Sequence, residues 1–84
     1  MLERNEVFNK LKDILLIMDP LKKDLIENAT EDTLLVNDLG LSSVAMLYMV
    51  VAIEETFQIT FDELGVEDFK TVGQTINYIL EKMK

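Results

Sequence analysis

The sequence predicts a small all-α protein, a bundle of three to four helices with a long first loop. Apolar residues recur at helical spacing in three segments, and no segment alternates apolar and polar residues for long. Residue types that end or begin helices stand between these segments. The 84 residues suffice for one small domain, so we expect residues 1–84 to form a single domain.

The first helix is predicted over residues 3–18. Its buried stripe is spaced i, i+4, i+7, i+8 and i+11, and comprises Val7, Leu11, Ile14, Leu15 and Met18. Pro20 ends this helix, because a proline disfavours helical geometry at the residue before it. Pro20 could also open a short helical turn capped by Asp19. Residues 21–41 then form a long connection that contains several apolar anchors.

The second helix is predicted over residues 43–57, and it is apolar on almost every side. We expect its core stripe to comprise Val44, Leu47, Val50, Val51, Ile53 and Phe57. Its only charges are Glu54 and Glu55, and acids near the C-terminal end of a helix oppose the helix dipole. A requirement other than helix stability is therefore expected to explain them.

The last part of the chain is predicted to hold a helical turn over residues 62–67 and a final helix over residues 71–83. Thr71 and Gln74 form a T-x-x-Q capping box at the start of that helix. Its apolar stripe comprises Val72, Ile76, Ile79, Leu80 and Met83. Phe61, Leu64, Val66 and Phe69 are expected to anchor the short turn.

The composition narrows the possible functions. The chain has no cysteine and no histidine, which removes most nucleophile–base pairs and transition-metal sites, so we expect neither an enzyme nor a metal site. Residues 31–69 carry nine acids and no base within a net charge of −8. Such a segment repels nucleic acid and anionic membranes and suits a basic patch on a protein partner. Without a signal peptide or membrane span, a cytoplasmic location is expected.

The segment "NDLGLSS" at residues 37–43 precedes the second helix. A serine before a helix usually accepts a hydrogen bond from a free N–H of the first turn, and one serine is enough for this cap. The second serine is therefore open to another role. A helix start favours a phosphate group, and Gly40 lets the backbone turn without a side chain.

Several motifs together resemble the acyl carrier protein family. The family pattern D-L-G-x-D-S-[LI] stands here as residues 38–44, "VVAIEETF" at residues 50–57 matches the end of the family's second helix, and "KTVGQTINYI" at residues 70–79 resembles its last helix. The resemblance covers about residues 5–83. It implies that a phosphopantetheinyl transferase moves phosphopantetheine from coenzyme A onto Ser43, where it holds acyl groups as thioesters. Acyl-loading and ketosynthase-type enzymes with basic patches are then the partners, in fatty-acid or polyketide biosynthesis.

Two departures from the family pattern suggest a carrier with a dedicated partner in a specialised pathway. Ser42 replaces the usual aspartate, and the second helix has Ala45 and Tyr48 where fatty-acid carriers are acidic. An apolar docking surface and simple drift explain these changes equally well. The residues expected to contact partners are Asp38, Ser42, Val44, Met46, Tyr48, Glu54 and Glu55, with Ala45 and Met49 as further apolar candidates.

By the same resemblance, a small cavity between the second helix, the last helix and the loop would shelter the acyl chain. Its candidate lining residues, any of which could instead be ordinary core, are Val44, Leu47, Val51, Phe61, Leu64 and Ile76. Three other functions stay open: an aminoacyl or peptidyl carrier, an acidic helical adaptor that carries nothing, and a regulatory domain phosphorylated on Ser42 or Ser43. We expect the protein to be a monomer.

Overall fold

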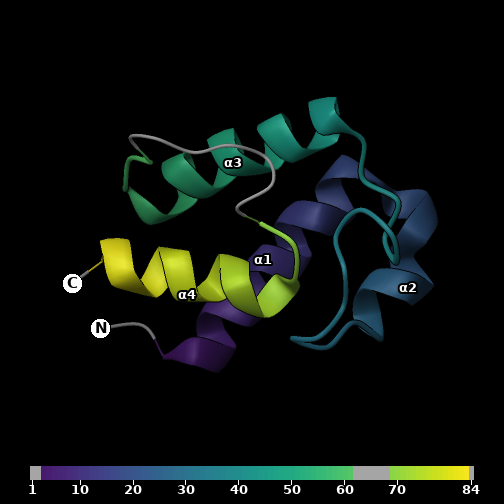
Figure 1. Ribbon diagram of the computed structural model, residues 1–84, viewed down its shortest axis with the longest axis horizontal. Coiled ribbons are helices and arrows are strands. Elements are labelled where there is room, and N and C mark those ends of the chain that lie inside the picture. Colours follow the sequence, from purple (N-terminus) through teal and green to yellow (C-terminus); the bar gives the residue numbers. More distant parts are fainter. Residues whose placement is uncertain (1–2, 62–68, 84) are drawn as a thin grey trace.

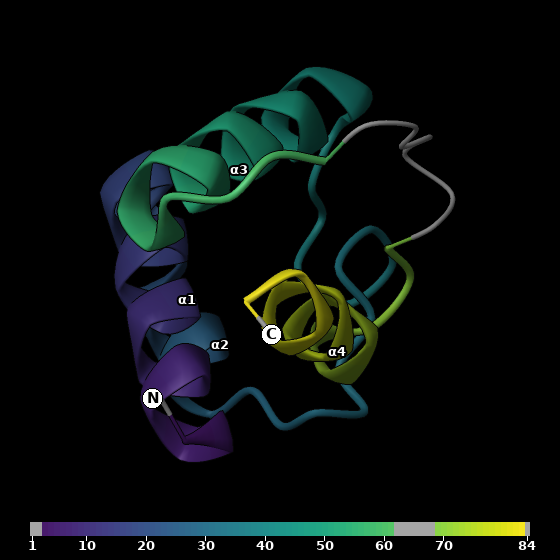
Figure 2. The same cartoon turned by 90° about the vertical axis from the view of Figure 1, so that its left-hand side faces the viewer.

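A computed structural model describes residues 3–61 and 69–83 and confirms the all-α class. Its helices are α1 (Arg4–Met18), a 3₁₀ turn η1 (Pro20–Lys22), α2 (Lys23–Glu27), α3 (Ser43–Phe57) and α4 (Val72–Lys82). α1 contacts α2, α3 and α4, so it is the helix on which the other three pack (Figure 1). In Figure 2, α4 is seen end-on beside α1, and α3 crosses above both. The helical turn predicted at residues 62–67 lies outside the described residues.

The helix ends follow the signals in the sequence. Pro20 stands at the first position of η1, directly after α1 ends. At the start of α4, Thr71 Oγ1 accepts from Gln74 N while Gln74 Oε1 accepts from Thr71 N, which completes the predicted capping box. The long connection contains the short helix α2, which the sequence analysis did not predict.

The long connection is also fastened to the start of α4. Leu35 N donates to Lys70 O at 3.0 Å, and Val72 N donates to Thr33 O at 3.0 Å. These backbone bonds resemble one step of an antiparallel ladder, with a bridge between Leu34 and Thr71. These hydrogen bonds therefore attach the loop that leads to α3 to the segment at the start of α4.

The predicted core stripe of α3 is wrong for three of its members. Val44, Leu47 and Val51 are 63 %, 58 % and 51 % exposed. The face of α3 that packs against the bundle comprises the predicted Ile53 and Phe57 together with Met46 and Met49, which the predicted stripe did not include. Of the other predicted stripe residues, Met18, Leu80 and Met83 are only partly buried against the core. The remaining buried core comprises Val7, Leu11, Ile14 and Leu15 of α1, Ile26 of α2, Leu35 and Leu39 of the loop, Phe61 and Phe69, and Val72, Ile76 and Ile79 of α4.

Candidate functional site

The two serines at the start of α3 have different surroundings. Ser42 is the N-cap residue, and its Oγ accepts a hydrogen bond from Ala45 N at 3.2 Å, as predicted for a cap. Ser43 is the first residue of the helix and is exposed. Its hydroxyl makes no hydrogen bond to any part of the chain that the structure describes. Of the two serine hydroxyls, that of Ser43 is therefore the one without a hydrogen bond in the described part of the chain.

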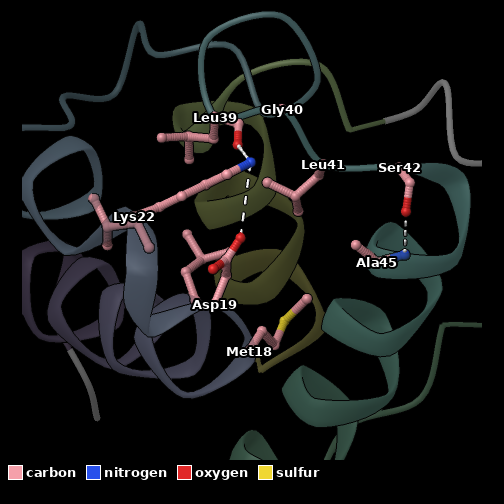
Figure 3. A pocket seen from close by; sticks show the side chains of 10 residues that line it. Met18, Asp19, Lys22, Leu39, Gly40, Leu41, Ser42 and Ala45 are labelled. Atoms are coloured by element: carbon pink, nitrogen blue, oxygen red, sulfur yellow. Dashed lines mark hydrogen bonds and ion pairs between the residues drawn. The ribbon is translucent and has the colours of Figure 1, made fainter.

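The loop before Ser42 turns at Gly40. Gly40 has φ = 70°, a left-handed conformation that glycine adopts at little cost. A Cβ atom at this position would lie 2.7 Å from Lys22 Nζ, so both conformation and space favour glycine. Lys22 Nζ donates to Leu39 O at 2.6 Å and lies 3.8 Å from Asp19 Oδ2 (Figure 3). Lys22 therefore links η1 to the loop that precedes Ser42 and Ser43.

A pocket of about 200 Å³ lies beside this loop, among α1, η1, α2 and the start of α3. Figure 3 shows the Lys22 side chain extending toward the loop, with Leu41 close by. The residues that line the pocket, called here the Lys22 pocket, are Leu15, Met18, Asp19, Lys22, Ile26, Leu39, Gly40, Leu41, Ser42 and Ala45.

The Lys22 pocket does not coincide with the cavity expected between α3, α4 and the loop. Of the expected lining residues, Val44, Leu47 and Val51 are exposed on α3, because this helix turns a different face inward. Phe61 and Ile76 are part of the core. Leu64 lies outside the described residues. None of the five described candidates lines the Lys22 pocket.

Of the apolar residues expected to contact partners, some are buried and others are exposed. Met46 and Met49 are 1 % and 0 % exposed, so the expectation that they face a partner is wrong. Val44 and Tyr48 are well exposed, together with Leu47 and Val51, which were expected to be interior. These four residues line a shallow, largely apolar surface of α3 and are called here the α3 patch: Val44, Leu47, Tyr48 and Val51.

Two of the acids expected to contact partners also accept hydrogen bonds from backbone N–H groups. Asp38 Oδ2 accepts from Leu34 N at 2.8 Å, which closes a turn of the loop. Glu54 Oε2 accepts from Phe61 N at 2.8 Å. Glu55 is exposed and its carboxylate makes no hydrogen bond within residues 3–61 and 69–83. Sequence reasoning missed these structural roles because the N–H donor of each bond, on Leu34 or Phe61, belongs to a residue outside the helices, where no periodic pattern fixes its position.

The start of α3 fits a phosphodiester on Ser43. The Ser42 cap uses Ala45 N–H, and Met46 N–H bonds to Ser42 O, so the first two N–H groups of the helix keep no backbone partner among the described residues. They lie at the positive end of a 15-residue helix, which favours an anion.

Within the described ranges no cluster of three His, Cys, Asp or Glu residues could hold a metal ion. No helix in these ranges has the length and apolar character needed to cross a membrane.

Comparison with known proteins gives one consistent result. A family model described as "Phosphopantetheine attachment site" matches residues 14–79. The acyl carrier protein of Thermotoga maritima is 34 % identical over 99 % of both chains, and that of Lactobacillus acidophilus is 32 % identical over 93 % of this chain and 94 % of its own. A solution structure of the apo doublet acyl carrier protein from prodigiosin biosynthesis has the same fold, with a TM-score of 0.63 and 24 % identity. It covers 92 % of this chain, which spans 38 % of that longer chain.

Proposed function

Because this chain belongs to the acyl carrier protein family, we propose that its phosphopantetheine is attached to the side-chain oxygen of Ser43. The protein is a carrier and not an enzyme, and its covalently bound phosphopantetheine supplies a thiol that holds acyl groups as thioesters. One observation carries the choice of serine. The Ser42 hydroxyl caps α3, whereas the exposed Ser43 hydroxyl has no partner in the described part of the chain.

The attachment step requires only that Ser43 present its oxygen to a transferase. That oxygen forms the new bond to phosphorus, the diphosphate P–O bond of coenzyme A breaks, adenosine bisphosphate leaves, and the hydroxyl proton passes to the transferase. The chain's own contribution is positioning. Gly40 turns the loop, Lys22 holds Leu39 O, and the free N–H groups of α3 favour the negative charge that results.

Intact mass after incubation with coenzyme A and a broad-specificity phosphopantetheinyl transferase tests this proposal. The wild-type chain and Ser42→Ala should each gain about 340 Da, and Ser43→Ala should gain nothing. Modification of Ser43→Ala would overturn the assignment. A gain of about 80 Da in cells would indicate phosphorylation, and no gain would indicate an adaptor that carries nothing.

Acyl carrier proteins work with transferases and synthases in general. For this chain, we propose that such partners dock on α3 through the α3 patch, with Glu55 meeting a basic residue on the partner. Two observations support this proposal. The four side chains of the α3 patch are large, exposed and turned away from the bundle, and the carboxylate of neighbouring Glu55 makes no hydrogen bond in the described part of the chain. Apolar contact supplies affinity, and charge steers the encounter.

An apolar docking surface also favours a dedicated partner in a specialised pathway, polyketide-type rather than housekeeping fatty-acid synthesis. We further propose that residues 1–84 act as a single carrier domain, as a monomer and in the cytoplasm. The packing of α2, α3 and α4 around α1 supports one cooperative unit. Light scattering of the modified protein tests the monomer, and a concentration-dependent mass would contradict it.

A further inference from the structure

Three large apolar side chains stand outside the core at the corner where α1, η1 and α2 meet. Ile17 is 82 % exposed, Leu21 is 96 % exposed and Leu25 is 55 % exposed. The core takes Ile26 from this stretch instead, so packing within the chain does not account for the other three. These residues, Ile17, Leu21 and Leu25, are called here the η1 corner.

We propose that the η1 corner is a second contact surface for the phosphopantetheinyl transferase, which covers it with an uncharged apolar surface while it acts on Ser43. This inference rests on the proposed attachment at Ser43. It adds, to docking on the α3 patch, a contact on a different part of the bundle.

The three side chains belong to one region of the surface. They are spaced i, i+4 and i+8 along the chain. The turn η1, which carries Leu21, contacts both α1, which carries Ile17, and α2, which carries Leu25, and α1 and α2 also contact each other. A single apolar surface on an enzyme can therefore cover all three.

The η1 corner lies beside the start of α3. The Lys22 pocket is lined on one side by Met18, Asp19 and Lys22 and on the other by Ser42 and Ala45 (Figure 3). The first three residues are sequence neighbours of the η1 corner, and the last two flank the proposed attachment site in the sequence. A pocket of about 200 Å³ thus separates the two features.

The size of an ordinary interface brings the η1 corner within the footprint of an enzyme that reaches Ser43. Such an interface covers about 800 Å² and about 20–30 residues on each partner, and a round one is about 30 Å across. The whole molecule measures 32 × 25 × 21 Å along its principal axes, and the α3 patch supplies four residues. The enzyme must therefore also contact elements across the Lys22 pocket, where η1 offers its exposed leucine.

The charges around Leu21 favour an apolar contact over an ionic one. Lys22 Nζ lies 3.8 Å from Asp19 Oδ2, and Lys23 directly precedes Asp24, so charges of both signs alternate here. Residues 31–69, by contrast, carry nine acids and no base. Steering by charge therefore belongs to the acidic segment, and the η1 corner contributes apolar contact.

The test compares kcat/KM for modification of the wild-type chain, Leu21→Ser and Ile17→Ser by a broad-specificity phosphopantetheinyl transferase with coenzyme A, followed by intact mass. Both variants should fold as the wild type does, because both side chains are exposed, and circular dichroism checks this. Each should lower kcat/KM about fivefold, as expected when an apolar contact at an interface is removed. The loss should lie in KM, because the contact is the same before and during the reaction.

Lys23→Ser is the matched control. Lys23 is also exposed, is two positions from Leu21 and has no ion pair in the described part of the chain. Its kcat/KM should stay close to that of the wild type. A loss as large as that of Leu21→Ser would show that the contact is ionic and would overturn the inference.

Salt gives a second readout. The ratio of kcat/KM between the wild type and Leu21→Ser should be the same at low and high salt, because salt does not screen an apolar contact. A ratio that falls to one as salt is added would also overturn the inference.

The outcomes separate this inference from the proposed function. Wild-type kcat/KM for both Leu21→Ser and Ile17→Ser, on chains that become fully modified, would overturn the second contact surface alone. A wild-type chain that gains no mass with coenzyme A and transferase would overturn both proposals.

Discussion

The Glu54 carboxylate accepts a hydrogen bond from the backbone N–H of Phe61 at 2.8 Å, across seven residues of sequence. The bond holds the chain that leaves α3 against the last turns of that helix. It explains why an acid stands at a place where the helix dipole disfavours it. The neighbouring Glu55 has no such bond in the described chain, so two adjacent acids have different roles.

Replacing each acid by alanine should separate these roles. Glu54→Ala leaves Phe61 N–H without its charged acceptor and should lower the free energy of unfolding by about 1–2 kcal/mol. Glu55→Ala should change it by less than about 0.5 kcal/mol, because the side chain is exposed. Urea unfolding monitored by circular dichroism measures both. Equal destabilisation by the two variants would contradict the structural role of Glu54.

A second prediction concerns Gly40. Gly40→Ala forces a side chain into the left-handed region and brings Cβ to 2.7 Å from Lys22 Nζ, so it should cost about 1–2 kcal/mol of stability. In a Lys22→Ala background the contact is absent and only the conformational cost remains. Gly40→Ala should therefore cost less in that background. A double-mutant cycle in urea measures the difference, and strict additivity would show that the contact carries no energy.

The sequence was sufficient for the bounds of α1, α3 and α4 but not for the inward face of α3. Pro20, Ser42 and the Thr71–Gln74 box mark ends through local chemistry, which sequence shows directly. In α3, however, residues 46, 49 and 53 are spaced i, i+3 and i+7, and so are residues 44, 47 and 51. Both stripes are apolar, so periodicity alone cannot choose between them; packing against the bundle decides.

The features of the candidate site were predictable where they depend on neighbouring residues, and were not predictable where they depend on contacts between distant residues. The roles of Ser42 as cap and Gly40 as turn follow from neighbouring residues, and the structure agrees with both. The position of Lys22 against Leu39 O depends on a contact across 17 residues and on a turn too short to show periodicity. Helix α2 escaped prediction for the second reason, since five residues hold barely one helical turn.

A third prediction concerns pH. Arg4 donates to the Glu31 carboxylate through Nε and Nη2, and Arg4 Nη1 also donates to Asn77 Oδ1. The hydrogen bond from Arg4 holds the pKa of Glu31 below its ordinary value of 4.5. A depressed pKa stabilises the fold above pH 4.5, and this contribution is lost as the pH falls through the folded-state pKa.

The wild-type chain should therefore be more stable than Glu31→Gln at pH 7, by about 0.2–1 kcal/mol for a pair with both side chains about 40 % exposed. Near pH 3 the two chains should approach each other in stability. Asp32→Asn is the control, because Asp32 is an exposed neighbour without an ion pair in the described part of the chain. A constant difference between wild type and Glu31→Gln from pH 7 to pH 3 would show that the charge is irrelevant.

A fourth prediction tests docking on the α3 patch. Leu47→Asp and Tyr48→Ser should each leave stability within about 1 kcal/mol, because both side chains are more than half exposed. Each should lower kcat/KM for modification by the transferase about tenfold, as expected when an apolar contact at an interface is removed. Val36→Asp is a matched control, since Val36 is 52 % exposed but lies in the loop. Equal rates for all three variants and wild type would place docking elsewhere.

The last prediction concerns the residue that departs from the family pattern. Ser42→Asp should keep the cap on Ala45 N–H, because aspartate is as good an N-cap as serine, and its charge also suits the helix dipole. Stability should therefore be unchanged or slightly higher. The added charge next to Ser43 should raise kcat/KM with a transferase that has a basic docking surface, and the gain should shrink as salt is added. Ser42→Asn, an uncharged cap of the same shape, is the control. A salt-independent gain, or an equal gain with asparagine, would show that the transferase does not respond to charge at this position.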